Sequence, residues 1–225
     1  MASPRREQIA AIAAIDDPQR AALYDYVSRS SDPVGREDAS QELGLARSTV
    51  AFHLDRLVEQ GLLVTEYRRL SGRTGPGSGR PAKLYRRAPG DVQVSIPPRQ
   101  YELAGELLAM AIEEAERGDI PVRQALTTVA TETGRRLGTA AGSLGAALEE
   151  GGYEPRADDA GGIALANCPF HRLASAHTDL VCHANAALLR GIADGVGADP
   201  DTVERVTPGD HGCCVRVAAA QDAIR

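Results

Sequence analysis

Four cysteines and four of the five histidines of this 225-residue chain lie within residues 168–214. They are Cys168, Cys182, Cys213 and Cys214, with His171, His177, His183 and His211. Thiolate and imidazole are the side chains that bind zinc and iron–sulfur clusters in proteins. Clustered cysteines in a reducing compartment are more often metal ligands or reactive thiols than disulfides. The sequence therefore predicts a metal or cluster site here, with a thiol redox switch or inert buried thiols as the alternatives.

The region that carries these residues predicts a small α+β domain. Short strands are expected over 152–158, 161–168, 201–206 and 213–218, and helices over 169–176 and 178–197. Cys168 and Cys182 cannot meet on one straight helix, because fourteen residues at about 1.5 Å each separate them by roughly 21 Å. We therefore expect a break near residues 175–179, with Thr178 or Asp179 capping a second helix that folds back.

The same pattern predicts how individual thiols behave. Cys182 would lie in the first turn of the second helix, where the helix dipole favours a thiolate. Successive residues of a strand point to opposite faces, so Cys213 and Cys214 should point apart. We expect only one of this adjacent pair to face a common site.

Residues 1–90 predict a DNA-binding domain. A helix over 36–43 ends at Gly44, and a second helix within 45–61, ended by Gly61, carries the apolar positions Val50, Leu54, Leu57 and Val58. Two helices joined by a short glycine-containing turn form a helix-turn-helix, whose second helix enters the major groove. The expected DNA contacts are Arg47, Ser48, Thr49, His53 and Arg56. As alternatives, Ser48 could act only as a helix cap and Arg56 as a solvated charge.

Residues 65–87 predict a hairpin with seven basic residues against the single acid Glu66. Beside a helix-turn-helix such a hairpin is a wing, and we expect Arg73, Arg80 and Lys83 to neutralise phosphates. The alternative is a solvated loop. Residues 1–90 hold 14 Lys and Arg against 11 Asp and Glu, whereas residues 91–225 hold 11 against 20. The net charge of −6 therefore conceals a basic, DNA-facing half.

Residues 91–150 predict a helical linker or dimerisation region, and residues 151–225 the α+β sensor domain. The amphipathic stretch 99–117 suits pairing across a dimer axis, and we expect a homodimer on a pseudo-palindromic site. No signal peptide or apolar span is found, which predicts a cytoplasmic protein without a membrane partner. No HExxH motif, phosphate-binding loop or paired-carboxylate motif predicts an enzyme.

Several segments resemble known repressors. "GRPAKLY" and "ARSTVAFHLDRLVEQGLL" are similar to the wing and recognition helix of ArsR-like and MarR-like bacterial repressors. Nearly the whole chain resembles the SufR-like repressors of iron–sulfur cluster assembly genes. That resemblance is carried by the winged helix and by "ANC" at 166–168, "LVCHANAALL" at 180–189 and "VERVTPGDHGCCVRV" at 203–217.

The resemblance implies a homodimer whose C-terminal domain binds an iron–sulfur cluster that controls DNA binding. Matched by position, the ligands would be Cys168, Cys182 and Cys213, with Cys214, His183, His211, an oxygen ligand or an exogenous group in the fourth place. Thirteen residues separate the first two cysteines, one more than in the family pattern, and a further cysteine found in some members is absent. A mixed Cys/His zinc site suits the same residues.

Overall fold

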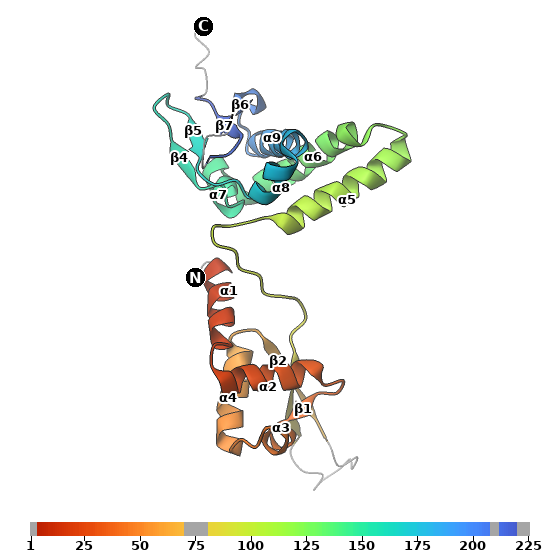
Figure 1. Cartoon of the computed structure of the whole chain (residues 1–225), viewed down its shortest axis with the longest axis vertical. Helices are drawn as coiled ribbons and strands as arrows, with labels where there is room; N and C mark the ends of the chain where they lie inside the picture. Colours follow the sequence, from red (N-terminus) through yellow and green to blue (C-terminus); the bar gives the residue numbers. More distant parts are fainter. Residues whose placement is uncertain (1–3, 70–80, 208–211, 220–225) are drawn as a thin grey trace. The chain divides into compact units, whose positions relative to one another are not determined.

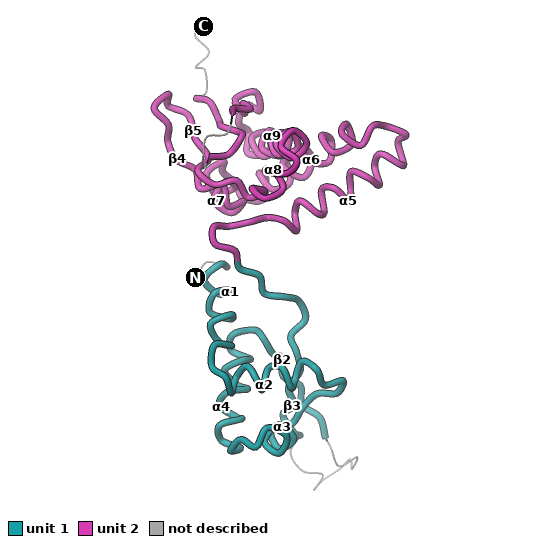
Figure 2. Tube along the Cα trace, in the orientation of Figure 1, with its two compact units in different colours: residues 1–94 teal, residues 95–225 magenta. Residues whose placement is uncertain are grey.

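A computed structural model describes residues 4–69, 81–207 and 212–219 as a mixed α+β protein. This confirms the α+β class predicted from the sequence. The chain divides into two compact units, unit 1 over residues 1–94 and unit 2 over residues 95–225 (Figure 2). Within the described ranges, no helix has both the length and the apolar character needed to cross a membrane.

Unit 1 contains four helices and a three-stranded sheet in its described part (Figure 1). The elements are α1 (Pro4–Ala14), α2 (Pro18–Arg29), β1 (Val34–Gly35), α3 (Arg36–Leu43), α4 (Arg47–Glu59), β2 (Leu63–Arg68) and β3 (Ala82–Arg87). The sheet is antiparallel in the order β1-β3-β2. At the start of α2, the Asp17 side chain accepts hydrogen bonds from the backbone N–H groups of Gln19 and Arg20, and Pro18 occupies the first helical position.

The turn between α3 and α4 depends on one glycine. Gly44 ends α3 in the left-handed conformation with φ of 64°, which the sequence predicted and which costs a glycine little. After this turn, α4 buries Val50, Leu54 and Leu57 in a core that also contains Leu23 of α2. The packing of α4 thus follows its helical apolar period.

Unit 2 consists of a helical layer and a four-stranded antiparallel sheet in the order β4-β5-β7-β6. Its elements are α5 (Tyr101–Gly118), α6 (Val122–Ala141), α7 (Leu144–Glu150), β4 (Pro155–Ala157), β5 (Ile163–Leu165), α8 (His171–Ala176), α9 (Thr178–Gly195), η1 (Pro200–Thr202), β6 (Val203–Arg205) and β7 (Val215–Val217). Residues from α5 and α6 share one core with α9 and the strands. The helices expected to form a separate linker region therefore belong to the same unit as the cysteines.

Helices α6 and α9 pack against each other in unit 2 (Figure 1). Their backbones meet at two pairs of glycines. A Cβ atom added to Gly134 would lie 2.0 Å from the Leu188 carbonyl oxygen, and one added to Gly191 would lie 2.0 Å from the Thr131 carbonyl oxygen. Gly138 and Gly195, one turn further along each helix, make equivalent contacts. The two helices therefore run in the same direction, at a separation so small that only glycine fits at these positions.

We predict that Gly134→Ala destabilises the protein by at least about 3 kcal/mol, because the new methyl group meets backbone that cannot move without separating α6 from α9. Gly145→Ala in α7 is the matched control, since nothing lies within 4 Å of its added Cβ. The control should gain about 0.5–1 kcal/mol from the better helix former. Urea unfolding of the full-length chain compares the two variants. If Gly134→Ala and Gly145→Ala were equally stable, the close backbone contact at Gly134 would be wrong.

Candidate functional site

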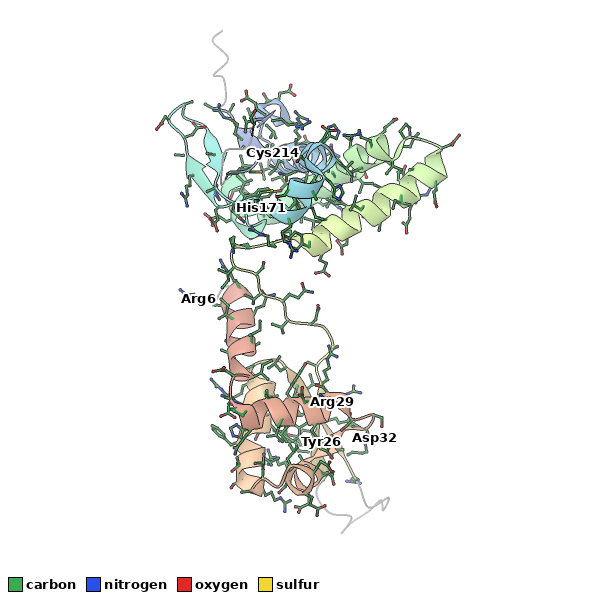
Figure 3. The ribbon with its side chains drawn as sticks, viewed as in Figure 1. Arg6, Tyr26, Arg29, Asp32, His171 and Cys214 are labelled. Carbon is green, nitrogen blue, oxygen red and sulfur yellow. The ribbon has the colours of Figure 1, made fainter. Side chains whose placement is uncertain are left out.

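The four cysteines reach the core of unit 2 from three separate segments. Cys168 follows β5, Cys182 lies in α9, and Cys213 and Cys214 directly precede β7. All four are buried free thiols, and Figure 3 labels Cys214 inside this unit. The antiparallel pairing of β5 with β7 brings the first and last of these segments together, and the Cys213 N–H donates to the Leu165 carbonyl oxygen.

The thiols interact with one another in a chain. Hydrogen bonding with Cys213, opposed by burial, lowers the pKa of Cys168. Hydrogen bonding with Cys213, again opposed by burial but assisted by Cys182, lowers the pKa of Cys214 to about 6. Burial and interactions with Cys214 raise the pKa of Cys182 to about 12, and hydrogen bonds with its two neighbours and burial raise the pKa of Cys213. The contacts thus link Cys168 to Cys213, Cys213 to Cys214 and Cys214 to Cys182.

Two predictions about these thiols are wrong. The pKa of Cys182 is raised rather than lowered, because burial and the neighbouring Cys214 disfavour its thiolate. Cys213 and Cys214 do not divide between two faces, since β7 begins only at Val215 and both thiols contact other cysteines. The helix α9 also starts without a side-chain cap, and the Thr178 hydroxyl instead donates to the Ala174 carbonyl oxygen in α8.

These thiols do not form a ready-made metal site. Over residues 4–69, 81–207 and 212–219, no three His, Cys, Asp or Glu side chains are arranged to hold a metal ion. Nε2 of His183 lies 2.9 Å from the Thr127 hydroxyl of α6, so this candidate ligand is engaged by the neighbouring helix. His211 lies outside the described residues. The structure therefore brings together the three predicted cysteine ligands and Cys214 as hydrogen-bonded thiols.

The outer face of α4 differs from the prediction at one residue. Arg47, Ser48 and Arg56 are exposed and Thr49 is half-buried. His53 is only 8% exposed and lies on the core face beside Leu54 and Leu57, so it is not placed to reach DNA. One helical step away, Phe52 is 65% exposed. Its i, i+4 spacing from Ser48 and Arg56 places these three side chains in one stripe, a signal that the sequence offered and that the assignment of His53 overlooked.

A second polar cluster holds the hairpin against α4. The Asp55 carboxylate accepts hydrogen bonds from Lys83 Nζ at 2.7 Å, from the Tyr85 hydroxyl at 2.6 Å and from Arg36 Nη2 at 2.7 Å. Lys83, predicted to contact phosphate, is therefore used within unit 1. Arg73 and Arg80 lie outside the described residues. Sequence reasoning missed Asp55 because its partners are 19 to 30 positions away.

The comparisons with known proteins leave the identity of the chain open. No protein-family model matches it, and no curated protein is significantly similar. The function must therefore be argued from the residues and their geometry.

We predict that Asp55→Asn lowers stability at neutral pH by roughly 1 kcal/mol, because it removes a charged acceptor shared by three donors. Burial raises the pKa of Asp55, but the hydrogen bonds from Lys83 and Tyr85 and the charge of Arg36 prevail and lower it below 3.8. The ionised carboxylate thus stabilises the fold above pH 3.8 and loses this effect as the pH falls through its lower folded-state pKa.

Thermal unfolding of wild type and Asp55→Asn between pH 7 and pH 3 measures this difference, which should narrow at the acid end. Asp25→Asn is the control, because Asp25 forms an exposed ion pair with Arg29 at 3.6 Å. Its effect should stay below about 0.5 kcal/mol. A gap for Asp55→Asn that is the same at every pH would exclude the proposed role of its charge.

Proposed function

We propose that this chain is a DNA-binding transcriptional repressor of the winged helix-turn-helix class, with an iron–sulfur cluster in unit 2 that senses iron–sulfur or redox status. The proposal depends chiefly on one observation. Four free thiols from three segments meet in the core of unit 2, while unit 1 is built around two helices joined at Gly44. We place the protein in the cytoplasm, where such thiols stay reduced.

The surface of α4 supports DNA recognition. In this proposal α4 is the recognition helix, and its exposed stripe of Ser48, Phe52 and Arg56 reads base edges in the major groove. A phenylalanine suits contact with a thymine methyl group, and an arginine suits guanine. Arg47 forms an exposed ion pair with Glu37 at 3.0 Å. Exposed pairs of this kind contribute little to stability, so Arg47 can exchange its partner for a phosphate.

Helix α5 supports the homodimer. Tyr101, Gly105, Leu108 and Ile112 follow one another at intervals of four, three and four residues, and all four are exposed. This is the spacing of a helix that packs on another helix. Nothing lies within 4 Å of a Cβ added to Gly105, which leaves room for close approach. A two-fold axis along this stripe would pair it with the same stripe of a second copy.

The proposed cluster ligands are Cys168, Cys182 and Cys213, with Cys214 the nearest candidate for the fourth position. The donor types suit such a group, since iron–sulfur clusters are held by cysteine thiolates and all four thiols contact a neighbouring cysteine. The thiols must rearrange to hold it, because no three of the described His, Cys, Asp or Glu side chains are placed to bind a metal ion. A bound cluster would supply a charge that changes with iron supply and oxidation. Binding replaces the hydrogen-bonded chain of thiols, because ligands must lose their protons.

The loop of Cys168 is tied directly to the segment that leads into unit 2. Arg99 Nη1 donates to Asn167 Oδ1 at 2.5 Å and to the Cys168 carbonyl oxygen at 3.2 Å. The Gln100 N–H donates to the Pro169 carbonyl oxygen at 3.1 Å. Asn167, Cys168 and Pro169 thus all bond to the chain segment around Arg99 and Gln100, which begins unit 2.

In the proposed function, a movement of Cys168 on cluster binding would shift this segment. That gives the coupling between the cluster and DNA binding a direct route along the chain.

Anaerobic purification with iron, sulfide and zinc assays and an absorption spectrum tests the cluster. We expect brown protein with iron and sulfide in similar amounts, and we expect Cys168→Ser, Cys182→Ser and Cys213→Ser each to lose most of the colour. DNA selected from a random double-stranded library by the brown protein then serves as the operator. Two chains should bind each operator, and Phe52→Ala or Arg56→Ala should weaken binding about 10-fold or more.

His53→Gln is the control for the DNA contacts, because the side chain is buried and should leave operator affinity unchanged apart from any loss of folded protein. A colourless protein that contains stoichiometric zinc would exclude the cluster and indicate a zinc site, which four thiols can also form. Protein with neither metal, never exposed to air, would instead favour a thiol switch. Equal operator affinity of the cluster-loaded and cluster-free forms would overturn the sensing role.

We further predict that Arg99→Ala reduces the difference in operator affinity between the cluster-loaded and cluster-free protein, while cluster content stays unchanged. The substitution removes both Arg99 bonds to the Cys168 loop but none of the thiols. Arg156→Ala, an exposed arginine on β4, is the matched control and should retain the full difference. Fluorescence anisotropy with labelled operator measures the wild type and both variants, each with and without the cluster. If Arg99→Ala responds to the cluster as the wild type does, the anchor does not transmit the signal.

A further inference from the structure

A hydrogen-bonded pair of polar side chains lies deep in the core of unit 2. Tyr153 is 1% exposed and Asn185 is 2% exposed, and both are surrounded by apolar residues such as Leu148 and Leu188. The Tyr153 hydroxyl donates to Asn185 Oδ1 at 2.6 Å. Burial, together with the nearby cysteines, raises the pKa of Tyr153 well above its ordinary value, so this hydroxyl remains a proton donor.

This bond fixes the orientation of the Asn185 amide. Because Oδ1 accepts from Tyr153, the NH₂ group points the other way, and Nδ2 donates to Cys213 Sγ at 3.2 Å. One N–H group of the Asn185 amide is therefore directed at the Cys213 sulfur.

Packing alone does not explain the pair. A leucine and a phenylalanine of similar shape would fill the same space without the cost of burying an amide and a hydroxyl. The polar atoms instead form one chain of hydrogen bonds, from the Tyr153 hydroxyl to the Asn185 amide and from that amide to the Cys213 sulfur. An N–H donor to a ligand sulfur withdraws electron density from it, and such hydrogen bonds set the reduction potential of iron–sulfur sites.

We propose that Asn185, oriented by Tyr153, is a positioning residue that directs a hydrogen-bond donor at the sulfur atom of Cys213 and thereby raises the reduction potential of the cluster. The inference rests on the proposed function for the identity of the bound group. That Asn185 donates to the Cys213 sulfur rests on the geometry alone. Asn185 occurs within the helix α9 that also supplies Cys182, so one helix provides both a proposed ligand and the donor to another.

Redox titration of the anaerobically purified protein, followed by visible absorbance, tests the inference. The potential should be lower in Asn185→Leu, and lower by a smaller amount in Tyr153→Phe, which keeps the amide but frees it to turn. Ile192→Val is the matched control, because it also alters a buried α9 residue and removes no polar atom. Its potential should equal that of the wild type. Tyr153→Phe keeps the test valid if Asn185→Leu fails to fold, since it deletes a single oxygen.

A second readout separates this inference from the proposed function. Co²⁺ added to the cluster-free protein gives a sulfur-to-cobalt charge-transfer band, which should move to longer wavelength in Asn185→Leu because the sulfur is more electron-rich without the donor. If the wild type binds a cluster but Asn185→Leu and Tyr153→Phe leave its potential unchanged, the role of Asn185 is overturned while the proposed function stands. A colourless wild type whose cobalt band still moves would overturn the cluster and support Asn185. No movement of the band in either variant would overturn the inference.

Discussion

The contact between the backbones of α6 and α9 is the constraint on which the rest of unit 2 depends. Gly134 and Gly138 of one helix and Gly191 and Gly195 of the other leave no room for any side chain between them. Two helices held at this distance cannot slide independently, since their packing is close to that of a solid. Flanking contacts, such as the bond between Thr127 and His183, fix the same register. Helix α9 is therefore a rigid support for Cys182 and Asn185. Helix α6 in turn packs against α5, so the three helices share one core.

This rigidity explains how polar chemistry can be kept inside an apolar core. Four thiols, an amide and a phenol are buried among leucine and alanine side chains, and each unpaired polar atom there would cost free energy. The Tyr153 hydroxyl and the Asn185 amide are paired with each other, and the amide with sulfur. The thiols contact one another in the pairs Cys168–Cys213, Cys213–Cys214 and Cys214–Cys182. In the proposed sensor the ligand thiols lose their protons, so ligand binding must rearrange these contacts.

Local patterns in the sequence predict much of the fold but little of the site geometry. The cap at Asp17, the turn at Gly44 and the helix over 178–195 follow from rules that act over a few residues. His53 was misplaced because a histidine suits either face of a helix, and one residue of rotation decides between it and Phe52. The cysteine pair was misjudged because strand alternation applies only inside a strand, and β7 begins at Val215. Helix α5 shares its core with α9 through contacts that no local pattern encodes.

The charges of the described part of unit 1 bear on the kind of DNA binding we propose. Arg47, Arg56 and Lys83 each have an acidic partner in the free protein, Glu37, Glu59 and Asp55 respectively. The first two pairs are exposed and exchange readily with phosphate, whereas Asp55 has two further donors and keeps the hairpin on α4. A basic side chain that must first break an ion pair with a carboxylate adds less to non-specific DNA affinity than an unpaired one. In the proposed function, operator binding therefore depends on base contacts by the α4 stripe and on pairing two such stripes through α5.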